Sequence, residues 1–74
     1  MLEKEFRIRT YGKSELAMLY RPDLKEGNAR RTLYNWMKRN EKLMAALDAV
    51  GYDPKRRTLT PREVAIIVDF IGEP

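Results

Sequence analysis

The side chains best suited to chemistry in this 74-residue chain are basic, and most of them lie in its middle. Between Asn28 and Arg62 there are nine Lys and Arg residues and three acids, a balance of 9 − 3 = +6. The rest of the chain holds 15 − 9 = 6 basic and 11 − 3 = 8 acidic residues, a balance of −2. Such an uneven distribution favours an anionic partner.

The most informative functional pattern is a set of polar side chains on one side of a helix predicted over residues 28–39. At 100° per residue, the side opposite the apolar residues carries Arg31, Tyr34, Asn35 and Lys38, flanked by Arg30 and Arg39. Arg binds guanine edges and phosphates, Asn pairs with adenine, Lys contacts phosphate, and Tyr stacks or bonds to phosphate. A helix of this kind, followed by a second helix, is typical of an element that enters a DNA groove.

A second basic group, Lys55-Arg56-Arg57, lies in a polar loop predicted from Tyr52 to Thr58. We interpret this loop as a wing that follows the phosphate backbone, with Arg62 adding charge nearby. Each phosphate that it neutralises would steepen the log–log salt dependence of binding by about 0.9. The alternative is an ordinary solvated hairpin tip beside an ordinary solvated helix face.

Several classes of chemistry are excluded or disfavoured by the composition. The chain has no Cys and no His, which excludes disulfides and thiolate metal sites and removes the commonest general base. Glu15, Glu41 and Glu63 each fall in the first turn of a predicted helix, where the helix dipole favours an acid. With no nucleophile–base pair and no Gly-rich phosphate loop, we expect no enzymatic activity, no cofactor and no small-molecule substrate.

Four helices are predicted to position these side chains, over residues 13–20, 28–39, 41–50 and 61–71. Asn28 and Asn40 are candidate N-caps, and Gly51 and Gly72 are placed to end the third and fourth helices. The clearest start signal is the capping box Thr60-Pro61-Arg62-Glu63. Trp36 falls on the apolar stripe of the second helix, so we interpret it as a core residue.

A short strand is predicted from Glu5 to Thr10, where Phe6 and Ile8 alternate with basic residues, and its expected partner is Arg57-Thr58-Leu59. The expected fold is therefore mainly α: four short helices with a minor two-stranded β pairing, helix-turn-helix or winged-helix-like, in a single domain over residues 1–74. No apolar run approaches the roughly 20 residues that span a bilayer. We therefore expect a cytoplasmic protein without membrane contact.

Much of the chain also resembles a family of small uncharacterised proteins from Bacteroides-type gut bacteria, a domain of unknown function. The matching residues are Phe6 to Ala17, Leu19-Tyr20-x-Pro22-Asp23, Ala29-Arg30-Arg31-x-Leu33-x-x-Trp36, Gly51-Tyr52, Arg57-Thr58-x-Thr60-Pro61-Arg62-Glu63-Val64 and Gly72-Glu73-Pro74. The resemblance implies a cytoplasmic bacterial protein and brings no catalytic residues with it.

The order Glu15-Leu16-Ala17 on one helix and Ala29-Arg30-Arg31…Trp36 on the next is also similar to helix-turn-helix regulators. The expected connection from Arg21 to Gly27 has seven residues, against the 3–4 of the standard motif, which indicates an elaborated version.

The resulting hypothesis is a non-enzymatic module that binds duplex DNA, a small regulator or accessory protein. Two alternatives stay open. The chain could be a protein-interaction module or homodimeric adaptor, with Met37 and Met44 providing an adaptable apolar surface. It could instead bind RNA through the same basic face.

Overall fold

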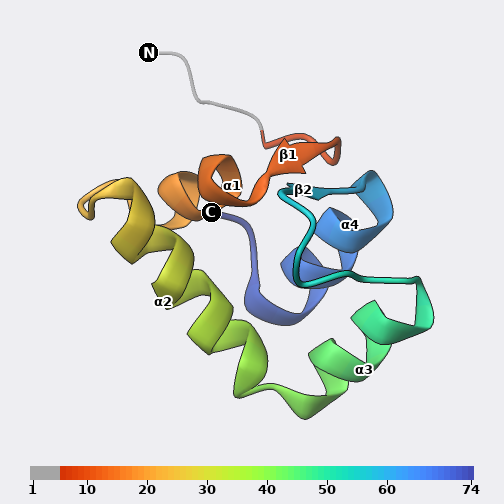
Figure 1. Cartoon of the computed structure of the whole chain (residues 1–74). Coiled ribbons are helices and arrows are strands. Elements are labelled where there is room, and N and C mark those ends of the chain that lie inside the picture. Colours follow the sequence, from red (N-terminus) through yellow and green to blue (C-terminus); the bar gives the residue numbers. More distant parts are fainter. Residues whose placement is uncertain (1–5) are drawn as a thin grey trace.

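The computed structural model describes residues 6–74, and in that part of the chain four helices pack around a short pair of strands (Figure 1). The elements in chain order are β1 (Tyr11–Gly12), α1 (Lys13–Tyr20), α2 (Glu26–Lys38), α3 (Glu41–Ala49), β2 (Thr58–Leu59) and α4 (Pro61–Ile71). The two strands are antiparallel. The expectation of a mainly helical fold with a minor two-stranded pairing is therefore confirmed.

Local capping signals account for the ends of α3 and α4. The Asn40 side chain accepts a hydrogen bond from the backbone N–H of Leu43 at 3.1 Å, as expected of an N-cap. At the start of α4, Thr60 accepts from the Glu63 backbone N–H and the Glu63 carboxylate accepts from the Thr60 N–H, which completes the predicted capping box. Gly51 follows α3 with φ +83°, a conformation that favours glycine.

The start of α2 differs from the prediction. The helix begins at Glu26, and its N-cap is Lys25 rather than Asn28. The backbone carbonyl of Lys25 accepts from the N–H of Ala29 at 2.8 Å, so an extra turn forms before the residue that the sequence marked as a cap. The connection after α1 is consequently residues 21–25, five residues instead of seven, and closer to the short turn of a helix-turn-helix.

The predicted strand over residues 5–10 is wrong in position. Glu5 lies outside the described residues, and residues 6–10 form no strand. The strand instead comprises Tyr11 and Gly12, which pair with Leu59 and Thr58, so the expected partner segment is right. Alternation predicts a strand only where a partner runs alongside, and β2 is too short to extend the pairing back to residue 6.

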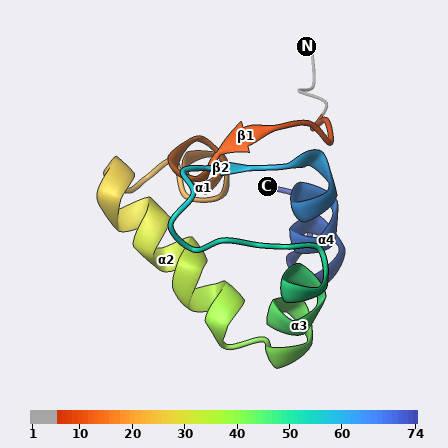
Figure 2. The same ribbon diagram turned by 45° about the vertical axis from the view of Figure 1, so that its right-hand side comes forward.

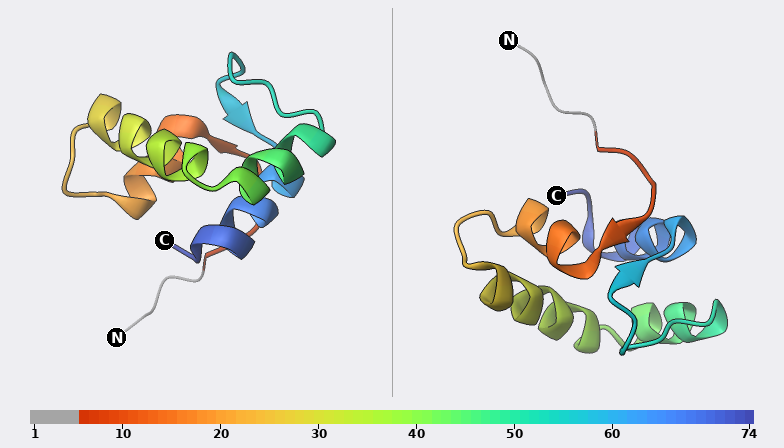
Figure 3. Two further views of the ribbon diagram at one scale, coloured as in Figure 1. Left: turned by 90° about the horizontal axis from the view of Figure 1, so that it is seen from below. Right: turned by 45° about the horizontal axis from the view of Figure 1, so that its top comes forward.

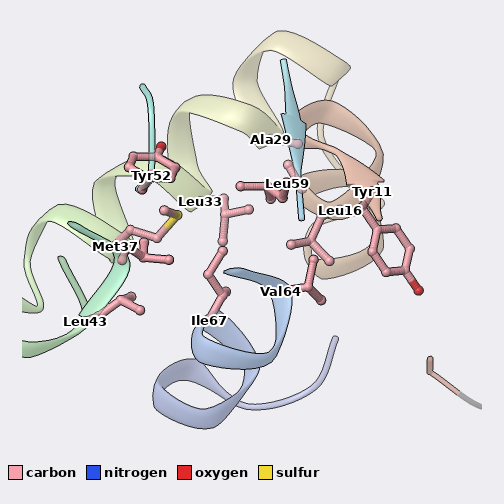
Figure 4. Close-up of a cluster of buried hydrophobic side chains, with 12 residues drawn as sticks. Tyr11, Leu16, Ala29, Leu33, Met37, Leu43, Tyr52, Leu59, Val64 and Ile67 are labelled. Atoms are coloured by element: carbon pink, nitrogen blue, oxygen red, sulfur yellow. The ribbon is translucent and has the colours of Figure 1, made fainter. Parts of the chain in front are cut away.

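The core lies between α2 on one side and α3 with α4 on the other, with α1 and the strand pair closing one end (Figure 2). Leu33 and Met37 of α2 meet Ile67 of α4 in its interior, and Leu59 and Tyr52 lie beside them (Figure 4). Trp36 is partly buried and packs edge-on against Tyr20, with ring centroids 6.2 Å apart. In the described part of the chain, no helix combines the length and the apolar character needed to cross a bilayer.

Candidate nucleic-acid interface

Helix α2 presents the polar face that its sequence predicts. Its core side is made by Ala29, Leu33 and Met37, all at most 4% exposed. The predicted contact residues of this helix are exposed: Arg30, Arg31, Tyr34, Asn35, Lys38 and, at the C-cap, Arg39. The helix therefore carries two different surfaces along its length, one in the core and one available to a partner.

The basic loop between α3 and β2 stands out from the body of the molecule (Figure 3, left). Two adjoining depressions lie where this loop meets α2 and the start of α1. The first, of about 390 Å³, lies between α2 and residues 52–54, and the second, of about 650 Å³, lies beside residues 54–58. Both are lined by Lys13, Arg30 and Pro54, so the two depressions adjoin each other.

We call these two adjoining depressions together the basic cleft. Within residues 6–74, its charged lining residues are Lys13, Arg30, Arg31, Lys55, Arg56, Arg57 and one acid, Glu26, a balance of 6 − 1 = +5. Five of the six cations were predicted as contact residues, and Tyr34 of the same set lines the cleft as well. The structure thus brings the basic end of α2 and the basic loop onto one surface.

Lys13 is a residue of the cleft that the sequence analysis missed. Its Nζ donates to the backbone carbonyls of Asp53 at 3.2 Å and Pro54 at 2.9 Å, and it lies 4.8 Å from the ring centroid of Tyr52. Lys13 therefore fastens the loop to the start of α1. Burial, and then the positive charge of Arg56 nearby, lower the pKa of Lys13 from its ordinary value. No local signal marks this role, because Lys13 and the loop are 40 residues apart in sequence.

The Arg56 side chain is held by contacts within the molecule, so it is less available to a phosphate backbone than a free cation would be. Its guanidinium forms an ion pair with Glu63, and its Nε donates to the carbonyl of Thr58 at 3.0 Å. Within residues 6–74, Arg56 is the only predicted contact residue held in an ion pair. Lys55 and Arg57 on either side of it are exposed. The loop therefore offers those two cations fully and Arg56 in part.

Glu63 has two roles: it completes the capping box at the start of α4, and it pairs with Arg56 of the basic loop. It is 1% exposed, so it is a buried counter-ion for the loop as well as part of the capping box. Burial alone would raise the pKa of Glu63, but hydrogen bonds from Arg56 and Thr60 outweigh burial and hold this pKa below its ordinary value of 4.5.

The remaining predicted contact residues lie outside the cleft. They are Asn35, Lys38, Arg39 and Arg62. Lys38 lies 5.4 Å from the ring centroid of Tyr34, so it continues the positive surface from the cleft along α2. Arg62 is in the first turn of α4, on a different element. Six of the ten predicted contact residues thus line the cleft, and four lie outside it.

Comparison with known proteins identifies a family. The family model described as "Domain of unknown function (DUF4248)" matches residues 7–74. No curated protein and no solved structure matches the chain.

Proposed function

We propose that this chain, which belongs to the DUF4248 family, binds duplex DNA through α2 and the basic loop. The observation that carries the proposal is the convergence of Lys and Arg side chains from three separate parts of the chain on one cleft. Like charges placed together repel each other, so their clustering costs free energy. A surface that only contacts water gives no reason for this clustering, whereas an anionic partner does.

The distribution of charge in the folded molecule supports a polyanionic partner. Residues 6–74 carry 14 − 9 = +5 at pH 7, and the residues that line the cleft also carry +5, so the rest of residues 6–74 is neutral overall, 5 − 5 = 0. Attraction for a phosphate backbone is therefore concentrated on one side. Phosphate contacts of this type position a protein on DNA and supply most of its non-specific affinity.

Helix α2 suits the role of the groove-facing element. Its 13 residues span about 20 Å at 1.5 Å per residue, and B-DNA's major groove, about 12 Å wide, admits a helix. Asn35 and Lys38 lie on its exposed side beyond the cleft, and Tyr34 lies at the cleft itself, so these side chains can meet base edges while the loop meets phosphates. The short connection of residues 21–25 is compatible with a helix-turn-helix-like arrangement of α1 and α2.

Fluorescence anisotropy with a labelled duplex, at salt concentrations between about 50 and 200 mM, tests the proposal. The unchanged chain should bind at the lower concentration and weaken steeply with salt. A double variant, Arg30→Gln with Arg31→Gln, should bind more weakly and reduce the magnitude of the log–log slope by about 2 × 0.9 = 1.8, if each side chain neutralises one phosphate.

A matched control removes two positive charges elsewhere. Lys42 on α3 and Arg7 before β1 are exposed and line neither depression, so Lys42→Gln with Arg7→Gln should bind almost as the unchanged chain does. Equal effects of the two double variants, or no binding at low salt, would overturn the proposal. Competition between duplex DNA and structured RNA distinguishes the two nucleic acids, and light scattering with a pull-down tests the protein-interaction alternative.

A further inference from the structure

The first depression of the basic cleft has an apolar base. Leu33 and Met37 from α2 and Leu59 from β2 line it, and their side chains belong to the core (Figure 4). Its volume of about 390 Å³ is within the range of small-molecule sites, about 300–1,000 Å³. An apolar base of this size favours a ligand with a flat or compact apolar body.

Two tyrosines from different elements line the same depression. Tyr34 projects from the exposed side of α2 and Tyr52 belongs to the loop. Burial raises the pKa of the Tyr52 hydroxyl, and the proximity of Tyr34 adds to this effect. Tyr34 is 38% exposed, so its ring is a surface on which a nucleobase can stack, and stacking accepts any base. Tyr52 is 9% exposed and has Lys13 Nζ 4.8 Å from its ring centroid, so it forms part of the wall of the depression.

In the described part of the chain, the charged residues that line this depression are all cations: Lys13, Arg30 and Arg31. Arg30 donates from Nη1 to the hydroxyl of Ser14 at 2.9 Å, which leaves its other N–H groups for a ligand. Arg31 makes no side-chain hydrogen bond or ion pair within residues 6–74. Lys13 has three N–H donors and uses two of them on the loop carbonyls.

We propose that this depression binds one unpaired nucleotide, with the base over the apolar floor beside Tyr34 and Tyr52 and the phosphate at Arg30 and Arg31. Asn28, at the same depression, supplies an amide donor and acceptor for the edge of the base. The inference shares the cations of the proposed function and adds to it a site for a base that is not in a duplex. Its source is either a free mononucleotide or one unstacked nucleotide of a strand.

Titration of the full ¹⁵N-labelled chain with adenosine monophosphate, followed by amide chemical shifts, tests the site. We expect shifts concentrated at residues 27–37 and 52–54. Adenosine and inorganic phosphate, which each carry half of the recognised chemistry, should bind at least about tenfold more weakly, because each loses either stacking or charge pairing. An oligonucleotide strand that competes at the same residues identifies the source as an unpaired nucleotide of a strand, while a mononucleotide without such competition identifies a free ligand.

Two variants with matched controls locate the ligand. Gly27 lines the depression and an added Cβ meets no atom within 4 Å, so Gly27→Phe should fill the opening and abolish binding. Ala45→Phe adds the same ring to an exposed position of α3 and should have no effect. Arg31→Gln should weaken binding about tenfold, while Arg7→Gln, an exposed position outside both depressions, should not.

The inference is wrong if inorganic phosphate binds as tightly as the mononucleotide, or if Gly27→Phe binds it unchanged. Its failure is separable from that of the proposed function. Duplex binding without mononucleotide binding removes the pocket and leaves the proposed function standing. Mononucleotide binding without duplex binding removes the proposed function and leaves the pocket standing.

Discussion

At the scale of single residues, the buried carboxylate of Glu63 connects the start of α4 with the basic loop. Its Oε1 accepts from the Thr60 N–H at 2.8 Å and from Arg56, while its Oε2 has no hydrogen-bond partner within residues 6–74. The two partners of the ion pair are unequally exposed, with side chains 34% accessible for Arg56 and 1% for Glu63. Removing one partner therefore has a different consequence from removing the other.

The first prediction compares Arg56→Gln with Glu63→Gln. Loss of Arg56 leaves a buried charge without its counter-ion and should lower the free energy of unfolding by about 2 kcal/mol. Loss of the Glu63 charge leaves a guanidinium that reaches water, and the Gln can still accept from Thr60, so the cost should be about 1 kcal/mol. Urea unfolding followed by Trp36 fluorescence measures both. If Glu63→Gln lowered the free energy of unfolding more than Arg56→Gln did, the need to pair the buried carboxylate would not explain the effect of this ion pair.

The second prediction concerns acid. Because the pKa of Glu63 is lower in the folded chain than its ordinary value of 4.5, its ionised form stabilises the fold above that pH. This contribution should be lost as pH falls below about 4.5 and through the folded-state pKa. The pKa values of Glu15 and Asp23 are also lowered, through hydrogen bonds from Gly12 and Arg21 respectively, so some acid dependence should remain in Glu63→Gln. Urea midpoints at a series of pH values check this, and an unchanged acid slope in that variant would contradict it.

At the scale of elements, the first turn of α2 contains a glycine that its conformation does not require. An added Cβ at Gly27 meets no neighbouring atom, so Gly27→Ala should stabilise the chain by about 0.5 kcal/mol through reduced freedom of the unfolded state. Gly51 is the matched control, because its φ of +83° makes Gly51→Ala destabilising by about 1 kcal/mol although space is equally open. Thermal unfolding of both variants measures the difference, and the same sign for both would refute the argument.

The elements predicted well are those whose signals are local. The capping box at Thr60 and the N-cap at Asn40 involve residues three apart, so their hydrogen bonds form wherever the helix forms. The predicted start of α2 was wrong because the Lys25 carbonyl accepts from the Ala29 N–H, so the helix begins two residues before Asn28. Residues 25–28 are all exposed, and no burial pattern marks this turn in the sequence. The strand was displaced because its pairing depends on β2, almost 50 positions away, and alternation carries no information on a partner's length.

In the candidate interface, too, features with local signals were predicted, and features that depend on contacts in the packed chain were not. The exposed side of α2 follows from helical periodicity, since its apolar residues fix which side faces the core. Two features do not follow from it. The β1–β2 pairing carries Lys13 to the loop, and the fold carries Glu63 to Arg56. Both contacts join segments whose proximity depends on the packed chain, so the sequence analysis listed Arg56 as a contact residue and left out Lys13.

At the scale of the whole molecule, clustering of charge has a cost that is independent of any ligand. Of residues 6–74, six cations and the acid Glu26 line the cleft. Arg56 is paired with buried Glu63, and the mutual repulsion of the other five cations opposes folding. The ion pairs Arg9–Glu15 and Arg21–Asp23 are exposed and stabilise the fold only a little. Salt that screens these pairs therefore removes little stability. Screening should therefore relieve more repulsion than it costs in attraction.

The last prediction follows from this balance: salt should affect stability and binding in opposite directions. Raising the salt from about 20 to 200 mM, which shortens the Debye length to below about 10 Å, should raise the free energy of unfolding by a few tenths of a kcal/mol while duplex affinity falls. Arg31→Gln should mimic both effects at low salt, because it removes one of the repelling charges together with a phosphate contact. Lys42→Gln, outside the cleft, should leave both nearly unchanged. Urea unfolding and anisotropy on the same samples measure the two responses, and a fall in stability with salt would mean that attraction, not repulsion, dominates the charged surface.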